Sequence, residues 1–443
     1  MRNTGINRTI FFKISWLVLL ISTICDYTIA DKFSLGFFTI NIQASSLALV
    51  IYLLVFIITF PLKEIPAVLN DKYNKGNIII LALLLFIAYL SSYFSLMQKY
   101  ALVTTTSRYT LYFLSLIITL CYIKYYEKAV EFILKSFVYI NLFIALSSIA
   151  EYFIPGFYRI LFDHFGIMES RHSNIRFGIA VYMRPSGFVT DSNLTAFTLG
   201  LSSYLLLLNR EKFNKIFEYS FYIITGITFG MLASRSALIM VVFLLVTLLV
   251  FRQVYWKNAL VYFILFVVIQ IITPQTQARF LNISDKKKKM EEMELGRPLI
   301  WKADYLAMQI NPWIGIGSGV FFKQSEVFIA KVENKISEDK YFTGINDPAL
   351  EMNQGINPHN IFFTMQIEYG VGGTILFLNL VLYNLVYLFR NKKFNSLASA
   401  LGILFVSSLS NYAPYYKYYL LIIIIYYVSI NCNLKPADGI QRS

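Results

Sequence analysis

Long apolar runs recur along almost the whole chain of 443 residues, and polar residues gather in the intervals between them. A run of about 17–25 apolar residues is long enough for an α-helix to cross the hydrocarbon core of a bilayer. Two of the polar intervals, 155–191 and 274–358, are much longer than the others. The pattern predicts about twelve spanning helices, at residues 9–29, 41–61, 77–97, 104–123, 129–154, 192–208, 216–233, 236–252, 257–273, 359–389, 396–411 and 416–432.

The composition agrees with a membrane protein. Hydrophobic residues make up 57% of the chain and charged residues only 14%, which is too apolar for an ordinary soluble domain. No repeat of solenoid period and no Gly/Ser-rich or Pro-rich linker divides the sequence. We therefore predict an all-α integral membrane protein in three parts: helices one to nine within 1–273, a large periplasmic loop over 274–358, and helices ten to twelve within 359–443.

The distribution of basic residues predicts the orientation. The intervals assigned to the cytoplasm are rich in Lys and Arg, whereas the short outer turns carry only Lys32, Lys99, Arg235 and Lys417. This asymmetry places both termini in the cytoplasm and both long loops outside. The net charge of +14 is spread over inner loops, so we expect no nucleic-acid partner. The first span lacks a tidy cleavage region, and we expect it to be retained.

The two long loops contain the candidate chemistry. The first is rich in arginine and ends at Arg184, just before Pro185 and Gly187, which favour a tight approach to the next helix. In the second, 298–310 is predicted to be a short helix against the membrane surface, with Arg297 at its start and Asn311-Pro312 at its end. The glycine-rich stretch 313–319 could cradle a phosphate. Without a strand–helix context, a flexible turn is the favoured interpretation.

His359 stands at the start of the tenth predicted span. Gln366, Gly370 and Gly373 follow it at 7, 11 and 14 residues, which places all four in one narrow stripe of a helix. Glycines on a membrane helix permit a neighbour to approach closely. We therefore expect His359 to face the protein interior or a cavity, with Glu368 on the opposite side. A capping or packing role for His359 is the alternative.

Three arginines are predicted at the same membrane surface: Arg184, Arg235 and Arg297. A guanidinium group binds phosphate oxygens bidentately, so their natural ligand is a phosphate or diphosphate. For each one alone, an interfacial residue that snorkels to water is the alternative. Arg108 and Glu151 fall near the outer ends of adjacent spans. Since a buried charge is costly in lipid, we expect these two to pair or to line one cavity.

The order of these motifs resembles that of a known family. His359-Asn360, nine residues, Gly370, two residues and Gly373 resemble a signature of the bacterial O-antigen ligase and polymerase superfamily. The segment from Arg184 to Gly187, the Ser-Arg-Ser turn at Arg235, and Arg297 with the Trp, Asn-Pro and glycines after it occur in the family's order. With the predicted twelve spans, the resemblance covers nearly the whole chain.

The resemblance implies a GT-C-type glycosyltransferase that needs no metal or cofactor. Its donor is a glycan on undecaprenyl diphosphate at the periplasmic face of the inner membrane. His359 would act as general base on the acceptor hydroxyl, and Arg184, Arg235 and Arg297 would stabilise the leaving diphosphate. Asn360, Arg108, Gly370 and Gly373 would support them.

The acceptor separates two enzymes with this chemistry. A polymerase transfers the glycan to the next lipid-linked repeat unit, whereas a ligase transfers the finished polymer to the lipid A core. The Arg184 segment favours the polymerase, whereas the spacing from His359-Asn360 to the glycines favours the ligase; of the two, we predict the polymerase. Whether a chain-length regulator binds is left open. The alternative of another class is a flippase for the same lipid, which predicts internal repeats and polar residues at mid-depth in several helices; most candidates here lie at outer ends.

Overall fold

The computed structural model describes residues 3–25, 28–35, 38–126, 128–154, 157, 174–177, 180–183, 185, 187–189, 192–232, 241–243, 245–246, 249–250, 256–273, 297–333 and 360–393. The long helices are α1 Asn3–Cys25, α2 Ala44–Thr59, α4 Lys72–Tyr93, α6 Leu111–Tyr125, α7 Ala129–Phe153, α9 Ser192–Leu208, α10 Lys215–Leu232, α12 Trp256–Ile272, α15 Arg297–Ile310, α16 Val320–Val332 and α18 Ile361–Arg390. Shorter turns of helix are η1 Leu62–Glu64, α3 Ile65–Leu69, α5 Gln98–Thr104, the π-helix η2 Thr105–Thr110 and η4 Arg210–Lys212.

The prediction of an α-helical membrane protein is confirmed. Within the described residues, five helices are long and apolar enough to cross a membrane, and a sixth is counted if α2 and the segment Leu62–Leu69 form one span bent by 97°. The predicted span 192–208 coincides with α9. The predicted spans 396–411 and 416–432 lie outside the described residues, as does part of 236–252.

Two β-hairpins lie between the helices and were not predicted. The first pairs β1 Thr28–Leu35 with β2 Phe38–Gln43, and the second pairs β3 Asn174–Phe177 with β4 Ala180–Met183. The first hairpin corrects two predicted boundaries, because α1 ends at Cys25 and α2 begins only at Ala44. Apolar residues at both ends of the hairpin adjoin those of the two spans, so hydropathy extended each span by a few residues into it. The second hairpin falls in the arginine-rich loop.

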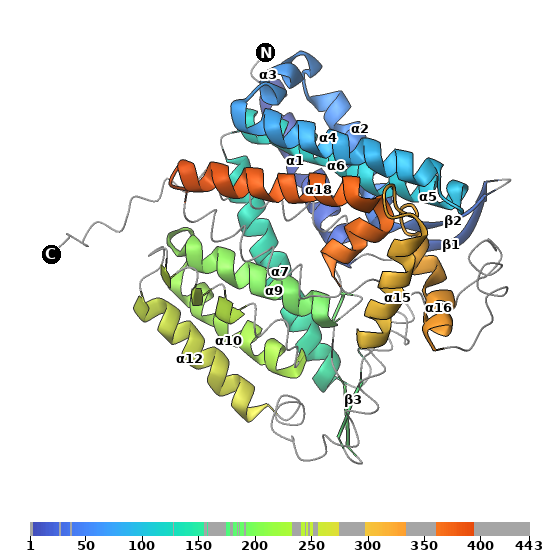
Figure 1. Cartoon of the computed structure of the whole chain (residues 1–443). Coiled ribbons are helices and arrows are strands. Elements are labelled where there is room, and N and C mark those ends of the chain that lie inside the picture. The colour runs from blue at the N-terminus through green and yellow to red at the C-terminus, as the bar shows by residue number, and fades with distance from the viewer. Residues whose placement is uncertain are drawn as a thin grey trace.

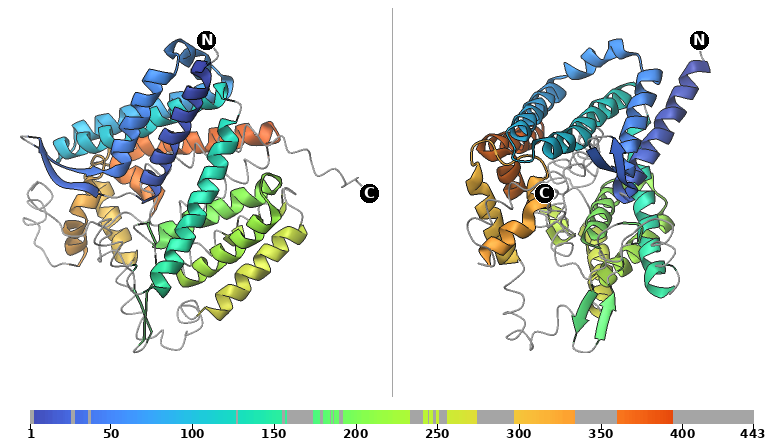
Figure 2. Two further views of the ribbon diagram at one scale, coloured as in Figure 1. Left: turned by 180° about the vertical axis from the view of Figure 1, so that it is seen from behind. Right: turned by 90° about the vertical axis from the view of Figure 1, so that its right-hand side faces the viewer.

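The helices form two groups (Figure 1). One contains α1, α2, α4, α5, α6 and α18, in which α18 packs along α4 and α1 along α2; the other contains α7, α9, α10 and α12. Two views from other sides show the same division, with α15 and α16 together at one end of the first group (Figure 2). A side-chain contact between α1 and α7 joins the groups: the Trp16 indole nitrogen donates to the Ser136 hydroxyl at 3.2 Å.

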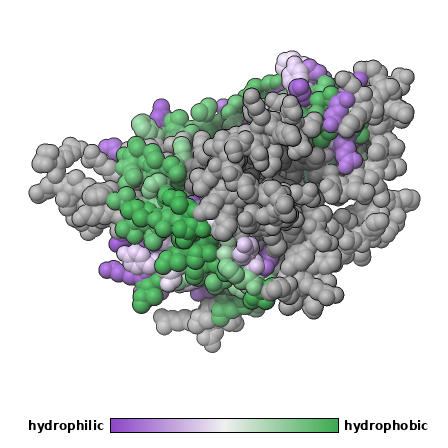
Figure 3. Space-filling view, turned by 90° about the horizontal axis from the view of Figure 1, so that it is seen from below, coloured by the Kyte–Doolittle hydropathy of each residue, from purple (hydrophilic) through white to green (hydrophobic). Residues whose placement is uncertain are grey.

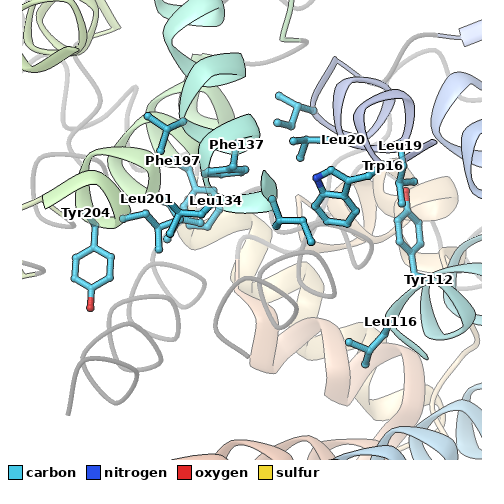
Figure 4. Packing of buried hydrophobic residues seen from close by; sticks show 14 of the residues in the cluster. Trp16, Leu19, Leu20, Tyr112, Leu116, Leu134, Phe137, Phe197, Leu201 and Tyr204 are labelled. Atoms are coloured by element: carbon cyan, nitrogen blue, oxygen red, sulfur yellow. The ribbon is translucent and has the colours of Figure 1, made fainter. Parts of the chain in front are cut away.

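The core of the first group is aromatic. Tyr122 is fully buried and stacks on Phe12, with ring centroids 4.3 Å apart. Its hydroxyl is 2.8 Å from that of Thr59. Around Trp16, buried side chains from α1, α6, α7 and α9 come together, so the core continues from one group into the other (Figure 4).

Much of the outer surface is apolar. Seen from below, one broad hydrophobic area faces the viewer (Figure 3). The helix α12, which lies along the lower edge in Figure 1, exposes large apolar side chains in successive turns: Leu260, Val261, Phe263, Ile264, Val268, Ile271 and Ile272. Side chains of this kind on the outside of a helix bundle are what contact with lipid tails requires.

Candidate functional site

The helix α18 is broken at Gly370, and the chain that follows α15 fills the break. Gly370 has φ 63° and ψ −163°, which no helix contains. The N–H of Ile316 donates to the carbonyl of Ile367 at 2.8 Å, and the N–H of Val371 donates to that of Pro312 at 2.9 Å. We call this interaction of residues 311–319 with 366–371 the α18 contact. It connects the two segments by backbone hydrogen bonds.

Glycines make the α18 contact possible. A Cβ on Gly315 would collide with the backbone of Glu368, and one on Gly370 would collide with the backbone of Trp313. Both residues also have positive φ, which favours glycine. The predicted close approach at Gly370 is thus confirmed. At Gly373 the atoms nearest to an added Cβ belong to Tyr369 in the same helix.

The glycine-rich stretch 313–319, predicted as a flexible turn, packs closely against α18. The N–H of Gly315 donates to Asn311 at 2.8 Å, and that of Gly317 to Glu368 at 3.2 Å. These N–H groups therefore have partners within the protein. Glycine here serves the close packing of two backbones, which sequence alone does not distinguish from freedom of movement.

Four buried hydroxyl groups lie beneath the α18 contact: those of Ser92, Thr105, Ser318 and Tyr369. Ser318 is central, at 2.6 Å from Thr105, 3.2 Å from Tyr369 and 3.3 Å from Ser92. Ser92 and Thr105 are themselves 2.7 Å apart. The cluster joins α4, η2 and α18 to the loop. The cluster was not predicted, although Ser91, Ser92, Ser95 and Thr104–Thr106 lie close together in the sequence at neighbouring helix ends.

Glu368 is also buried beside this cluster. The Tyr109 hydroxyl, from the π-helix η2, lies 3.4 Å from its Oε2, and the ring of Tyr109 meets that of Tyr369 edge to face. A π-helical turn within an α-helix often marks a functional position. Arg108 lies in this same turn, so its backbone is next to the residues that contact Glu368.

The helices α15 and α18 lie side by side and begin at the same end. The Trp301 ring meets the Phe363 ring at 6.5 Å, and further along both helices Pro312 accepts a hydrogen bond from Val371. The two helices therefore run parallel over this stretch. Arg297 begins α15 about one turn before Trp301, and α18 begins about half a turn before Phe363. The predicted helix over 298–310 and its end at Asn311-Pro312 are confirmed.

Asn360 determines where α18 begins. Its side-chain oxygen accepts a hydrogen bond from the N–H of Phe362 at 2.8 Å, and its backbone is extended. This is the usual arrangement of a helix N-cap. Because His359 precedes Asn360 directly, the cap fixes the point from which His359 extends.

Asp304 is a buried acid on α15. Its side chain is completely buried, and neither carboxylate oxygen has a hydrogen-bond partner among the described residues. Burial raises the pKa of this carboxyl from 3.8 to about 8, because an apolar environment disfavours the charged form. Asp304 is seven residues after Arg297, which puts both on one face of the helix. Its role was not predicted from the sequence.

The first long loop makes a comparable interaction with α7. Gly187, with φ 61°, donates its N–H to Glu151 Oε2 at 2.6 Å, and a Cβ there would collide with Ser147. The Phe188 ring stacks on Phe143 at 5.3 Å. We call this interaction of Gly187 and Phe188 with Ser147, Ser148 and Glu151 the α7 contact. The tight approach predicted at Pro185 and Gly187 is present, and one oxygen of Glu151 is used in it.

One stretch of the chain, which includes α15, α16 and the first part of α18, matches a known family. Residues 220–378 match the family of O-antigen ligases. The predicted resemblance to the O-antigen ligase and polymerase superfamily is thereby confirmed, and with it a ligase- or polymerase-type function in a multi-pass membrane protein. No curated protein matches the chain.

The O-antigen ligase match contains most of the predicted site residues. Arg235, Arg297, His359, Asn360, Gly370 and Gly373 lie within it, and Arg108 and Arg184 lie before it. His359, Arg184 and Arg235 are outside the described residues. For Arg297 and Arg108 the backbone is described, but the side chain is not. The proposed pairing of Arg108 with Glu151 and the diphosphate site thus remain predictions.

The part of the chain that the structure describes contains no cluster of metal-binding side chains. No group of three or more His, Cys, Asp or Glu side chains there could hold a metal ion.

Proposed function

We propose that this protein is an O-antigen polymerase, which transfers the glycan of an undecaprenyl diphosphate-linked donor to the next lipid-linked repeat unit. The common start of α15 and α18 supports the proposal most directly. Arg297 is the first residue of α15, and His359 lies two residues before the first residue of α18. Helices that begin side by side direct their free N–H groups and the positive ends of their dipoles to one region, which favours an anion there.

The proposed reaction divides the work between His359 and the arginines. The acceptor hydroxyl attacks the anomeric carbon of the donor, His359 as neutral imidazole takes the proton, and the bond from this carbon to the diphosphate oxygen breaks. Negative charge develops on the diphosphate, which Arg184, Arg235 and Arg297 stabilise through bidentate hydrogen bonds. Arg108, beside the α18 contact, is a supporting residue. The proposed mechanism needs no metal, because the leaving group is already good.

A ligase is the second candidate, and the description of the matched family as O-antigen ligase favours it. The two enzymes differ in the acceptor, so loss of the gene distinguishes them. A lost polymerase leaves lipopolysaccharide with a single repeat unit. A lost ligase leaves bare core and an accumulated lipid-linked polymer. Single-repeat lipopolysaccharide is the result we expect.

His359→Ala tests the chemistry. We expect it to abolish glycan transfer when it replaces the natural protein in cells, with unchanged abundance in the membrane. His172→Ala is the matched control, since it removes a histidine that has no role in the proposed reaction, and it should retain transfer. Retained transfer in His359→Ala would remove this residue from the role of base.

A flippase for the same lipid makes a different prediction. The purified enzyme in vesicles should change the glycan length or the acceptor of a lipid-linked repeat unit. If it moved the lipid across the bilayer and left the glycan unaltered, the enzyme proposal would be wrong.

The proposed reaction takes place at the periplasmic face, with both termini in the cytoplasm. The basic residues of the predicted inner loops support this orientation. A reporter fused after Ser443 that is active only in the cytoplasm tests it. An inactive reporter on an abundant protein would contradict the orientation.

A further inference from the structure

The helix α15 has two faces of different chemistry. Ala303, Asp304 and Ala307 are completely buried against the rest of the protein. On the other face, Trp301 is 48% exposed and Tyr305 is 62% exposed. Trp313, just beyond the end of the helix, is 74% exposed. Three large aromatic side chains rarely remain exposed to water on one face of a folded protein, so we expect this face to be covered.

These aromatic side chains stand on a fixed part of the structure. The Trp301 ring has one edge against Phe363 of α18. Trp313 belongs to the α18 contact, where its backbone lies directly against Gly370. The exposure therefore does not arise from a helix that has lost its packing. It arises on a segment that backbone hydrogen bonds and glycine contacts connect to the helices.

The aromatic face adjoins the apolar surface of the spanning helices. On α4, Phe86, Leu90 and Tyr93 are exposed along one stripe, and Phe94 follows directly. Within the same last turns, the Ser91 hydroxyl donates to the Glu368 carbonyl and the Ser95 hydroxyl to the Ile316 carbonyl. The lipid-facing stripe of α4 thus ends where the α18 contact begins. Figure 1 shows α15 running across this end of α4 and of the part of α18 that follows Gly370, rather than along them.

The residue types on the face identify the environment that it fits. The exposed stripes of α4 and α12 consist mainly of Leu, Ile, Val and Phe, as expected for lipid tails. The exposed face of α15 instead presents Trp301, Lys302, Tyr305 and Gln309, followed by Trp313. Tryptophan and tyrosine prefer the boundary between tails and headgroups, where lysine extends its ammonium group to the lipid phosphates. A helix that lies in this boundary has such a face.

We propose that α15 is an interfacial helix, and that Trp301, Tyr305 and Trp313 insert into the headgroup boundary of the bilayer at the end of α4 that carries Tyr93 and Phe94. The occupant of this surface is the bilayer itself rather than a protein partner. The depth of these three aromatic side chains in turn fixes the depth of Arg297, one turn before Trp301. This last consequence rests on the proposed function, because it places a donor-binding arginine at the level of lipid phosphates.

Fluorescence quenching tests the insertion without reference to activity. The chain has four tryptophans, and Trp16, which is completely buried, is the internal control. The full-length protein is placed in vesicles whose lipids carry bromine either near the headgroup or near the chain ends. The contribution of each residue is obtained by subtracting the spectrum of Trp301→Phe or Trp313→Phe. Trp16 itself needs no replacement, because its side chain is buried and hydrogen-bonded to Ser136.

We expect bromine near the headgroup to quench Trp301 and Trp313 more than bromine near the chain ends does. Iodide in the water should quench them less than it quenches a free tryptophan amide. Full quenching by iodide with no effect of either lipid would place the face in water and overturn the proposal. Stronger quenching near the chain ends, or none by any agent, would overturn it as well, the latter because protein would cover the face.

A second measurement separates this proposal from the proposed function. Trp313→Ala with Tyr305→Ser should raise the donor concentration needed for half-maximal transfer several-fold and leave the maximal rate nearly unchanged. If quenching succeeds but the natural protein transfers no glycan, the proposed function fails and the interfacial helix stands. If transfer is normal but lipid quenching is absent, the reverse holds.

Discussion

The α7 contact and the α18 contact have the same structural role but use different kinds of hydrogen bond. Each holds a long loop against the end of a helix, and each contains a glycine with positive φ that permits close approach, Gly187 in the first and Gly315 in the second. In the α7 contact a backbone N–H donates to a buried carboxylate, that of Glu151. In the α18 contact the described hydrogen bonds between loop and helix join carbonyls, N–H groups, a side-chain amide and hydroxyls.

This difference predicts how each contact fails. Much of the α7 contact depends on one side chain, because Glu151 accepts the hydrogen bond of the Gly187 N–H. The α18 contact spreads over several neutral bonds of about 1 kcal/mol each. Loss of one hydroxyl there should be tolerated. Loss of the close packing between the two backbones should not be tolerated.

The largest effect is expected from Gly315→Ala. The new Cβ would meet the Glu368 backbone, which cannot move aside as a side chain can, and φ at this position is +85°. Together these should cost about 3 kcal/mol or more. We expect a large fall in the midpoint of thermal unfolding of the purified protein. Gly372→Ala is the control, because there a Cβ meets only the tip of Ile87, at 3.3 Å. Equal effects of both substitutions would contradict this account.

Glu151→Ala should have the next largest effect, at the α7 contact. It leaves the Gly187 N–H buried without its acceptor, which costs about 1–3 kcal/mol. Glu151→Gln keeps an acceptor and should recover about half of the loss. The control in the same helix is Glu131→Ala, which removes an exposed ion pair with Lys135 and should cost less than about 1 kcal/mol. If Glu151→Gln were as harmful as Glu151→Ala, the hydrogen bond would not be the cause.

A third test concerns pH, through Asp304 on the helix that leads into the α18 contact. Its folded pKa of about 8 lies above the ordinary 3.8, so the folded state holds the proton more tightly than the unfolded state. Stability should therefore fall as pH rises between these two values, by at most about 1.4 kcal/mol per pH unit. Asp304→Asn should flatten this slope. Thermal unfolding of both proteins at pH 5, 6, 7 and 8 measures it, and parallel slopes would show that Asp304 is ordinary.

The smallest effect is expected from Ser318→Ala. It removes the central member of the four-hydroxyl cluster, but Ser92 and Thr105 keep their mutual hydrogen bond. We expect a loss of about 1–2 kcal/mol. Ser202→Ala, where the hydroxyl bonds only within α9, is the comparison and should cost less. A loss at Ser318 as large as that of Gly315→Ala would mean that the cluster rather than the glycine holds the loop.

The sequence was most informative where hydropathy and helix-end signals agree. The helix α9 and the helix α15 were predicted almost to the residue, since polar or proline-containing ends bound them. It was least informative about 28–43, where the apolar residues at the ends of a hairpin adjoin those of the helices on either side. The family motifs pointed correctly to Gly370, but not to the break in α18, because a helical stripe assumes an unbroken helix.

The residues of the candidate site also differ in whether a local signal in the sequence marks them. Residues with a local signal, such as the cap at Asn360 and the start of α15 at Arg297, could be located from the sequence. The hydroxyl cluster could not, because Ser92, Thr105, Ser318 and Tyr369 come from three distant parts of the chain. Asp304 escaped because nothing local marks a carboxylate that packing buries. The side chains of Arg297 and Arg108, and the whole of His359, Arg184 and Arg235, remain sequence predictions.

The break at Gly370 also sets the thickness of membrane that this protein suits. An unbroken helix of the 30 residues of α18 would be about 45 Å long, whereas the hydrocarbon core is about 30 Å thick. The break leaves the 20 residues from Val371 to Arg390 for crossing, which is about 30 Å. The remaining ten lie beside α15. Without Gly370 the helix would have to tilt or thicken the bilayer around it, so one glycine matches α18 to its membrane.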